Sequence, residues 1–218
     1  MTAWDRLSQT PELRSVPTES ARVRFVDDVL DPATCRSLIA RLGDDRWLST
    51  TADLRRPANG PHEAPRRRAE PEAPCRLIGF DEPPRFASID DPVLALRIFY
   101  RIAALLPETI EGAQLAGLKP LMRCVRLSAG EGTEAHHDPA RECSSGMHSH
   151  LSVVVFLNED FVGGGVEFPT LGKTLAAKRG RALVFPHGLL HRDALIERGD
   201  AFVLHAEVFY SGAWQPMR

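Results

Sequence analysis

The chain has 218 residues and a formal net charge of −2 at pH 7. This length is enough for one domain with a sizeable core, and the near-neutral charge gives no reason to expect a nucleic acid or an anionic membrane as partner. No apolar run approaches the roughly 20 residues needed to span a bilayer.

The N-terminus lacks the apolar core of a signal peptide, which favours a cytoplasmic protein. The four cysteines of the chain are scattered and include no C-x-x-C pair, so neither a zinc site nor a disulfide framework is indicated. We therefore expect free thiols at Cys35, Cys75, Cys124 and Cys143.

The first half of the chain predicts a support region. Residues 1–18 are polar and without a period, which is typical of a loosely held arm. A strand is expected at Arg22–Val29, followed by a helix that Asp31 caps, that begins at Pro32 and that ends at Gly43. Residues 49–74 are rich in proline and predict a flexible loop, which is either a lid or a segment without a role.

A second helix is expected at Asp91–Leu106, after a short strand at Arg76–Phe80. Asp91 or Asp90 would cap it, Pro92 would begin it and Pro107 would end it. Its broad apolar face needs a partner to cover, so the helix is predicted to buttress a sheet formed by the second half.

After Gly117 the pattern changes to short apolar segments separated by Gly, Pro, Asn and Asp. The predicted strands are Leu121–Leu127, Thr133–Asp138, His150–Leu157, Gly165–Phe168, Lys173–Ala177, Ala182–Phe185, Leu190–Ile196 and Ala201–Phe209. Eight such strands suit a double-stranded β-helix, or jelly-roll barrel. The expected fold is α+β but mainly β, with residues 19–119 as helical support and 120–212 as the barrel core of a single domain.

Three residues of the barrel form a candidate metal site. If Thr133–Asp138 is extended, His136 and Asp138 face one side and His137 faces the other. With His191, they make the two-His, one-carboxylate set that holds non-haem Fe(II) and leaves coordination positions open. His148 and His150 have the same i, i+2 spacing, but no carboxylate lies nearby in regular spacing; they could bind substrate or cosubstrate, compete for metal, or be polar residues at a strand entry.

An ordered set of motifs in residues 126–210 resembles the prolyl-4-hydroxylase-like family of iron- and 2-oxoglutarate-dependent dioxygenases. The motifs are Arg126-Leu127-Ser128-Ala129-Gly130, His136-His137-Asp138, Phe156 through Gly164, Gly180 through His187, Leu190-His191 and Gly199. The resemblance implies Fe(II) at His136, Asp138 and His191, with 2-oxoglutarate as cosubstrate and no catalytic residue required beyond the metal ligands. The implied reaction is hydroxylation, with O2, of an unactivated C–H bond in an amino-acid, peptidyl or small-molecule substrate.

The chain departs from this family at three positions of the cosubstrate pocket. Leu127 and Phe156 stand where the family has tyrosines, and Ala201 stands where it has the Lys or Arg that pairs with the distal carboxylate of 2-oxoglutarate. A buried carboxylate without a partner is costly, so another group must supply the charge. His205 is the first candidate, and the others are Arg126, Arg198, His148 and His150. The same departures leave two alternatives open, an iron oxygenase that does not use 2-oxoglutarate and a metal- or ligand-binding barrel without turnover.

Overall fold

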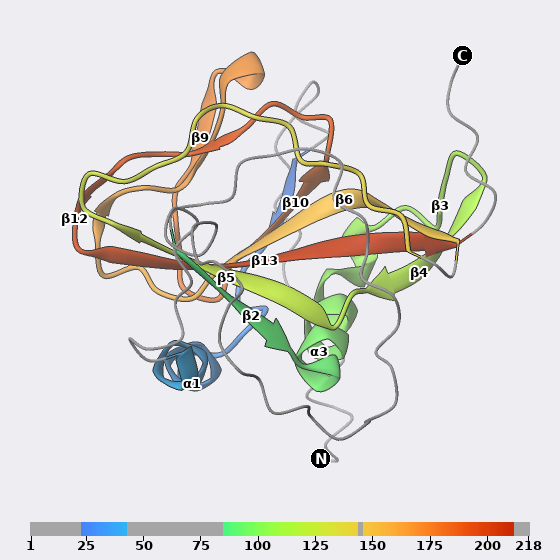
Figure 1. Ribbon diagram of the computed structural model, residues 1–218, viewed down its shortest axis with the longest axis horizontal. Helices are drawn as coiled ribbons and strands as arrows, with labels where there is room; N and C mark the ends of the chain where they lie inside the picture. Colours follow the sequence, from blue (N-terminus) through green and yellow to red (C-terminus); the bar gives the residue numbers. More distant parts are fainter. Residues whose placement is uncertain (1–22, 43–84, 144–145, 212–218) are drawn as a thin grey trace, which may run out of the picture.

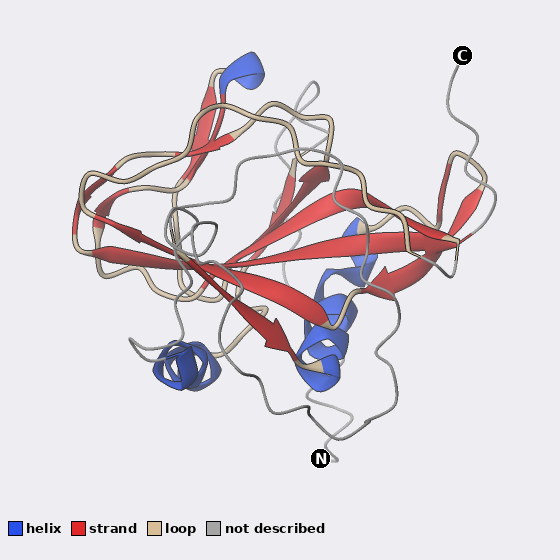
Figure 2. Ribbon diagram, viewed as in Figure 1, coloured by secondary structure: helices blue, strands red, loops and turns tan. Residues whose placement is uncertain are grey.

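The computed structural model describes residues 23–42, 85–143 and 146–211. The predicted arm, the loop 49–74 and the strand Arg76–Phe80 lie outside these ranges. Within them the chain forms a large antiparallel sheet, a smaller antiparallel sheet and a separate pair of strands, with helices against one side (Figures 1 and 2). None of the helices in the described ranges is long and apolar enough to cross a membrane.

The larger sheet is built on the C-terminal strand β13 (Asp200–Ser211). β13 pairs on one side with β5 (Leu121–Ser128) and β4 (Ala113–Leu118) and on the other with β6 (Met147–Phe156). β10 (Ala182–Pro186) continues the sheet from β6. The remaining members are β1 (Arg24–Val26), β2 (Phe86–Asp90) and β3 (Thr109–Ile110).

The smaller sheet faces the larger one across the barrel interior. It has the order β11 (Arg192–Asp193), β8 (Val166–Phe168) and β9 (Lys173–Leu175), and a 3-10 turn, η4 (Pro169–Leu171), joins the last two. A separate pair consists of β7 (Val162–Gly163) and β12 (Ile196–Arg198). Together the two sheets form the predicted jelly roll.

Two helices cover the outer face of the larger sheet. In α1 (Pro32–Leu42), Asp31 accepts a hydrogen bond from the Thr34 amide at 2.8 Å. In α3 (Pro92–Ile102), Asp91 accepts one from the Leu94 amide at 3.0 Å, and a 3-10 turn, η3 (Ala103–Leu105), follows. Their buried residues share one apolar core with the outward side chains of β6 and β13, so the helices buttress the sheet as predicted.

Some details differ from the predictions. The segment Thr133–Asp138 forms a single bridge, between His136 and His191, rather than a full strand. The predicted strand Leu190–Ile196 divides into β11 and β12. β2 was not predicted. Cys35 and Cys124 are free and buried, but Cys143 is disulfide-bonded, so the expectation of a free thiol there is wrong. Sequence spacing could not show this, because a disulfide depends on which segments the fold brings together.

Candidate metal centre

His136, Asp138 and His191 meet at one wall of the barrel. One ligand atom from each lies within 4.8 Å of the others. His136 Nε2 is 3.8 Å from Asp138 Oδ1, and His191 Nε2 is 3.6 Å from Asp138 Oδ2. The backbone holds this arrangement, because the amides of His136 and His191 each donate to the other's carbonyl, at 2.9 and 3.0 Å. The structure thus brings together the three residues selected from the sequence.

Both histidines are oriented for metal binding through Nε2. His136 Nδ1 lies 2.8 Å from the carbonyl oxygen of Glu134, and His191 Nδ1 lies 2.9 Å from that of Leu189. Since a carbonyl only accepts, each Nδ1 carries the proton and each Nε2 keeps a lone pair for a metal. His137 instead bonds the Gly188 carbonyl at 3.1 Å and does not belong to the cluster. This donor set fits Fe(II).

A chain of hydrogen bonds positions Asp138. The Ser152 hydroxyl donates to Asp138 Oδ2 and accepts from His187 Nδ1 at 2.7 Å. His187 Nε2 then accepts from the Ser149 hydroxyl at 2.9 Å, and that hydroxyl accepts from the Arg141 amide at 2.9 Å. Every donor in this series of hydrogen bonds has one acceptor, so a single set of proton positions satisfies the whole series.

The protonation states suit a cation. Burial raises the pKa of Asp138, but the nearby His191 and the Ser152 hydrogen bond outweigh it, and the pKa lies below its usual value. Burial lowers the pKa of His191, although Asp138 acts in the opposite direction. Burial also lowers the pKa of His187 to about 4. At neutral pH the site therefore offers the Asp138 carboxylate and a neutral His191 imidazole, the forms that bind metal.

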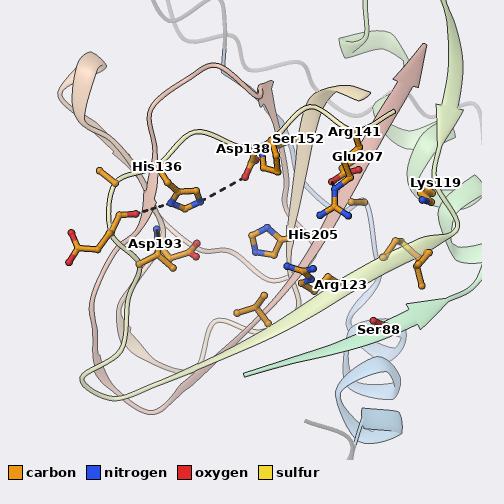
Figure 3. Close-up of a pocket in the computed structure, with 18 of the residues that line it drawn as sticks. Ser88, Lys119, Arg123, His136, Asp138, Arg141, Ser152, Asp193, His205 and Glu207 are labelled. Carbon is orange, nitrogen blue, oxygen red and sulfur yellow. Dashed lines mark hydrogen bonds and ion pairs between the residues drawn. The ribbon is translucent and has the colours of Figure 1, made fainter. Parts of the chain in front are cut away.

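A cavity of about 540 Å³ opens beside the cluster (Figure 3). His136 and Asp138 line it, and β5 and β13 contribute Arg123, His205 and Glu207. Arg141 also lines it and pairs with Glu207 at 2.6 Å. This volume is in the range of small-molecule sites.

The suggested cosubstrate residues are distributed unevenly around this cavity. His205 lines it, whereas Leu127, Phe156 and Ala201 are buried in the apolar core between the two sheets. Arg126 pairs with Asp200 at 3.1 Å and lies over the Phe202 ring at 5.7 Å.

The other three candidates do not line the cavity. His150 packs edge-on against Tyr210 at 5.4 Å, and His148 forms a bridge with Glu142. Arg198 is exposed on β12.

Sequence reasoning missed Arg123, Ser152 and Glu207. Arg123 shares the alternation of Val125 and Leu127, so its side chain faces the interior, and Glu207 follows His205 in the same way on β13. A charged residue in phase with buried positions is the feature that would have identified both. Ser152 has no such feature, because its role depends on the approach of Asp138.

No family model matches the sequence, and no curated protein is significantly similar to it. Solved structures do match. A prolyl-4-hydroxylase from Pseudomonas putida aligns over 88% of this chain and 94% of its own, with TM-score 0.55 and 14% identity.

Two further structures share the fold at 14% identity and TM-score 0.53. One is a viral collagen prolyl hydroxylase from Paramecium Bursaria Chlorella virus-1, solved with 2-oxoglutarate, which covers 86% of this chain and 96% of its own. The other is a prolyl hydroxylase from Trichoplax adhaerens in complex with a hypoxia-inducible-factor peptide, which covers 96% and 94%. The resemblance noted in the sequence thus extends to the fold.

Proposed function

We propose that this chain is a non-haem iron(II) oxygenase that uses 2-oxoglutarate and O2 to hydroxylate a C–H bond. The observation that carries the proposal is the convergence of His136, Asp138 and His191 at the edge of a cavity large enough for a small molecule or a side chain. Three protein ligands leave coordination positions for cosubstrate and oxygen. Iron with these two reactants supplies the oxidant.

The residues of this chain would hold the metal and orient the atoms that bind it. His136 and His191 present Nε2 because their Nδ1 protons are fixed on backbone carbonyls. Ser152 holds one oxygen of Asp138 and so orients the carboxylate. The cavity wall would place one C–H bond near the metal, which is the main contribution that a protein makes to this kind of chemistry. No side chain is required as an acid or base.

Amino-acid, peptidyl and small-molecule substrates all fit a cavity of this size. The fold similarity to two prolyl hydroxylases, one named for collagen and one bound to a peptide, supports the peptidyl class.

A second candidate is an iron oxygenase that does not use 2-oxoglutarate. The observation in its favour is the apolar barrel interior, where Leu127, Phe156 and Ala201 offer no cation for a distal carboxylate. Among the residues that the structure describes, the cations that line the cavity are Lys119, Arg123 and Arg141.

The test is an anaerobic titration of the Fe(II)-loaded protein with 2-oxoglutarate, in which chelation produces a visible charge-transfer band, followed by admission of O2 and measurement of succinate. The native chain and His137→Ala should give band and succinate, and His136→Ala should give neither. Oxygen consumption without a band or succinate would favour the second candidate. If the protein binds stoichiometric iron but consumes no oxygen with any candidate substrate, the remaining interpretation is a metal- or ligand-binding barrel without turnover.

A further inference from the structure

The inner face of the β5–β13 pair changes from apolar to polar along its length. Cross-strand neighbours are Leu127 with Ala201, Val125 with Val203 and Arg123 with His205. Because side chains two apart share a face, these three pairs point the same way. The first two pairs belong to the apolar core between the sheets. The third pair, Arg123 and His205, is named here the polar rung.

The polar rung lies in the same cavity as the metal ligands. Both of its residues line the cavity together with His136 and Asp138. Figure 3 shows the Arg123 guanidinium beside the His205 ring. The guanidinium also lies over the Phe86 ring, 4.7 Å from its centroid, which supports the side chain from β2.

His205 has an unmet hydrogen-bonding group. Its Nε2 is shielded from solvent and has no hydrogen-bond partner in the part of the chain that the structure describes. Buried polar nitrogens are normally paired, so this atom indicates a site that a ligand oxygen completes.

Charge in the cavity favours an anion at this place. Arg141 pairs with Glu207 at 2.6 Å, so this cation already has a partner in the cavity. A divalent ion on the triad would exceed the single charge of Asp138, and Arg123 adds a second cation on the opposite side of His205. Glu134 and Asp193 also line the cavity and oppose an anion near them, which directs the anion toward Arg123.

We propose that the polar rung is a carboxylate subsite, in which the Arg123 fork and His205 Nε2 hold the acidic group of a ligand that also reaches the metal. The proposal rests on the proposed function for the metal-bound end of that ligand. The carboxylate belongs either to the distal end of 2-oxoglutarate or to the substrate itself. In both cases the cation is Arg123, which lies two cross-strand pairs away from Ala201 on the same face of the sheet.

The experiment is calorimetric titration of the full chain loaded with Mn(II), whose occupancy of the triad is first measured by electron paramagnetic resonance. The ligands are 2-oxoglutarate and 2-oxopentanoate, which keeps the chelating head and lacks the distal carboxylate. Arg123→Met removes the charge but keeps the stem. Arg126→Met is the matched control on the same strand, because that guanidinium pairs with Asp200 outside the cavity.

If the subsite serves 2-oxoglutarate, Arg123→Met weakens its binding about 10- to 100-fold and leaves 2-oxopentanoate unchanged, as expected for loss of charge-assisted hydrogen bonds. Arg123→Lys should restore part of the loss. If the subsite serves the substrate, both keto acids are unaffected, and N-acetylglycine binds the 2-oxoglutarate-saturated native protein but not Arg123→Met.

The proposal is overturned if Arg123→Met changes no carboxylate's affinity more than Arg126→Met does. Absence of Mn(II) from the triad would instead count against the proposed function. The subsite is then tested with glutarate on the metal-free protein, where the same dependence on Arg123 is expected.

Discussion

Ser152 donates its hydroxyl proton to Asp138 Oδ2, so one oxygen of the carboxylate is held by the protein. The other oxygen, Oδ1, faces His136 at 3.8 Å. The same serine accepts a proton from His187, which ties the carboxylate to β6 and to the turn that follows β10. The triad is therefore held by side chains that never contact the metal position themselves.

Ser152→Ala should weaken metal binding about 10- to 100-fold, because a ligand that loses its hydrogen-bonded support loses orientation. Titration with Mn(II) or Fe(II) measures the change. Ser88→Ala, which removes a hydroxyl from the same cavity away from the triad, is the control and should bind metal normally. Equal affinity of Ser152→Ala and the native chain would show that Asp138 needs no such support.

His187→Gln should also weaken metal binding, since an amide cannot span both Ser149 and Ser152. If His187 acts through Ser152, the double variant with Ser152→Ala should bind metal no worse than Ser152→Ala alone. The network further requires the proton on Nδ1 of His187, and nitrogen NMR of the metal-free protein reports this tautomer. A proton on Nε2, or additive losses of affinity, would contradict the relay.

Two of the three candidate metal ligands could be selected from the sequence because they depend on local alternation. His136 and Asp138 share a face over three residues, and that relationship persists although the segment makes only one bridge. The helix caps Asp31 and Asp91 could likewise be predicted, because a cap depends only on residues next to it in the sequence. The exposed faces were less predictable, since Val93 and Leu96 of the apolar pattern are 70% and 53% exposed while Ala95 is buried.

Residues whose role depends on cross-strand pairing could not be found in this way. Arg123 becomes a neighbour of His205 only through the register of β5 with β13. Ser152, His187 and Ser149 come from β6 and the turn after β10, and no spacing in the sequence links them. Arg126 was instead suggested by its motif, yet it lies outside the cavity, in an ion pair with Asp200.

Glu207 should make the metal-free protein less stable as the pH rises. Burial raises its pKa from 4.5 to about 7, although Arg141 acts in the opposite direction. The folded chain thus binds a proton between pH 4.5 and 7 that the unfolded chain has lost, so stability falls across this window, by at most about 3 kcal/mol. His187, whose pKa falls from 6.5 to about 4, has the opposite slope.

Denaturant unfolding of Glu207→Gln should show this directly. Relative to the native chain, the variant should gain stability between pH 4.5 and 7 and keep a constant difference above that. Glu197→Gln, at an exposed position on β12, is the control and should follow the native curve. A constant difference between Glu207→Gln and the native chain across the window would mean that Arg141 keeps the carboxylate ionised.

Gly180 should be the least replaceable glycine at the junction between the barrel and α1. Its φ is +77°, and an added Cβ would collide with the carbonyl oxygen of Leu30, which is backbone and cannot turn aside. The Gly180 carbonyl also accepts a hydrogen bond from the Val29 amide at 2.8 Å, so the close approach of Gly180 to the segment before α1 is part of the fold.

Gly172 has a φ of +58° but open space around it, and provides a matched comparison. Gly172→Ala should cost about 1 kcal/mol for the left-handed backbone alone, whereas Gly180→Ala should cost about 3 kcal/mol or more because the two segments must separate. Urea unfolding of the two variants measures the difference, and equal losses would mean that α1 moves away from the barrel at little cost.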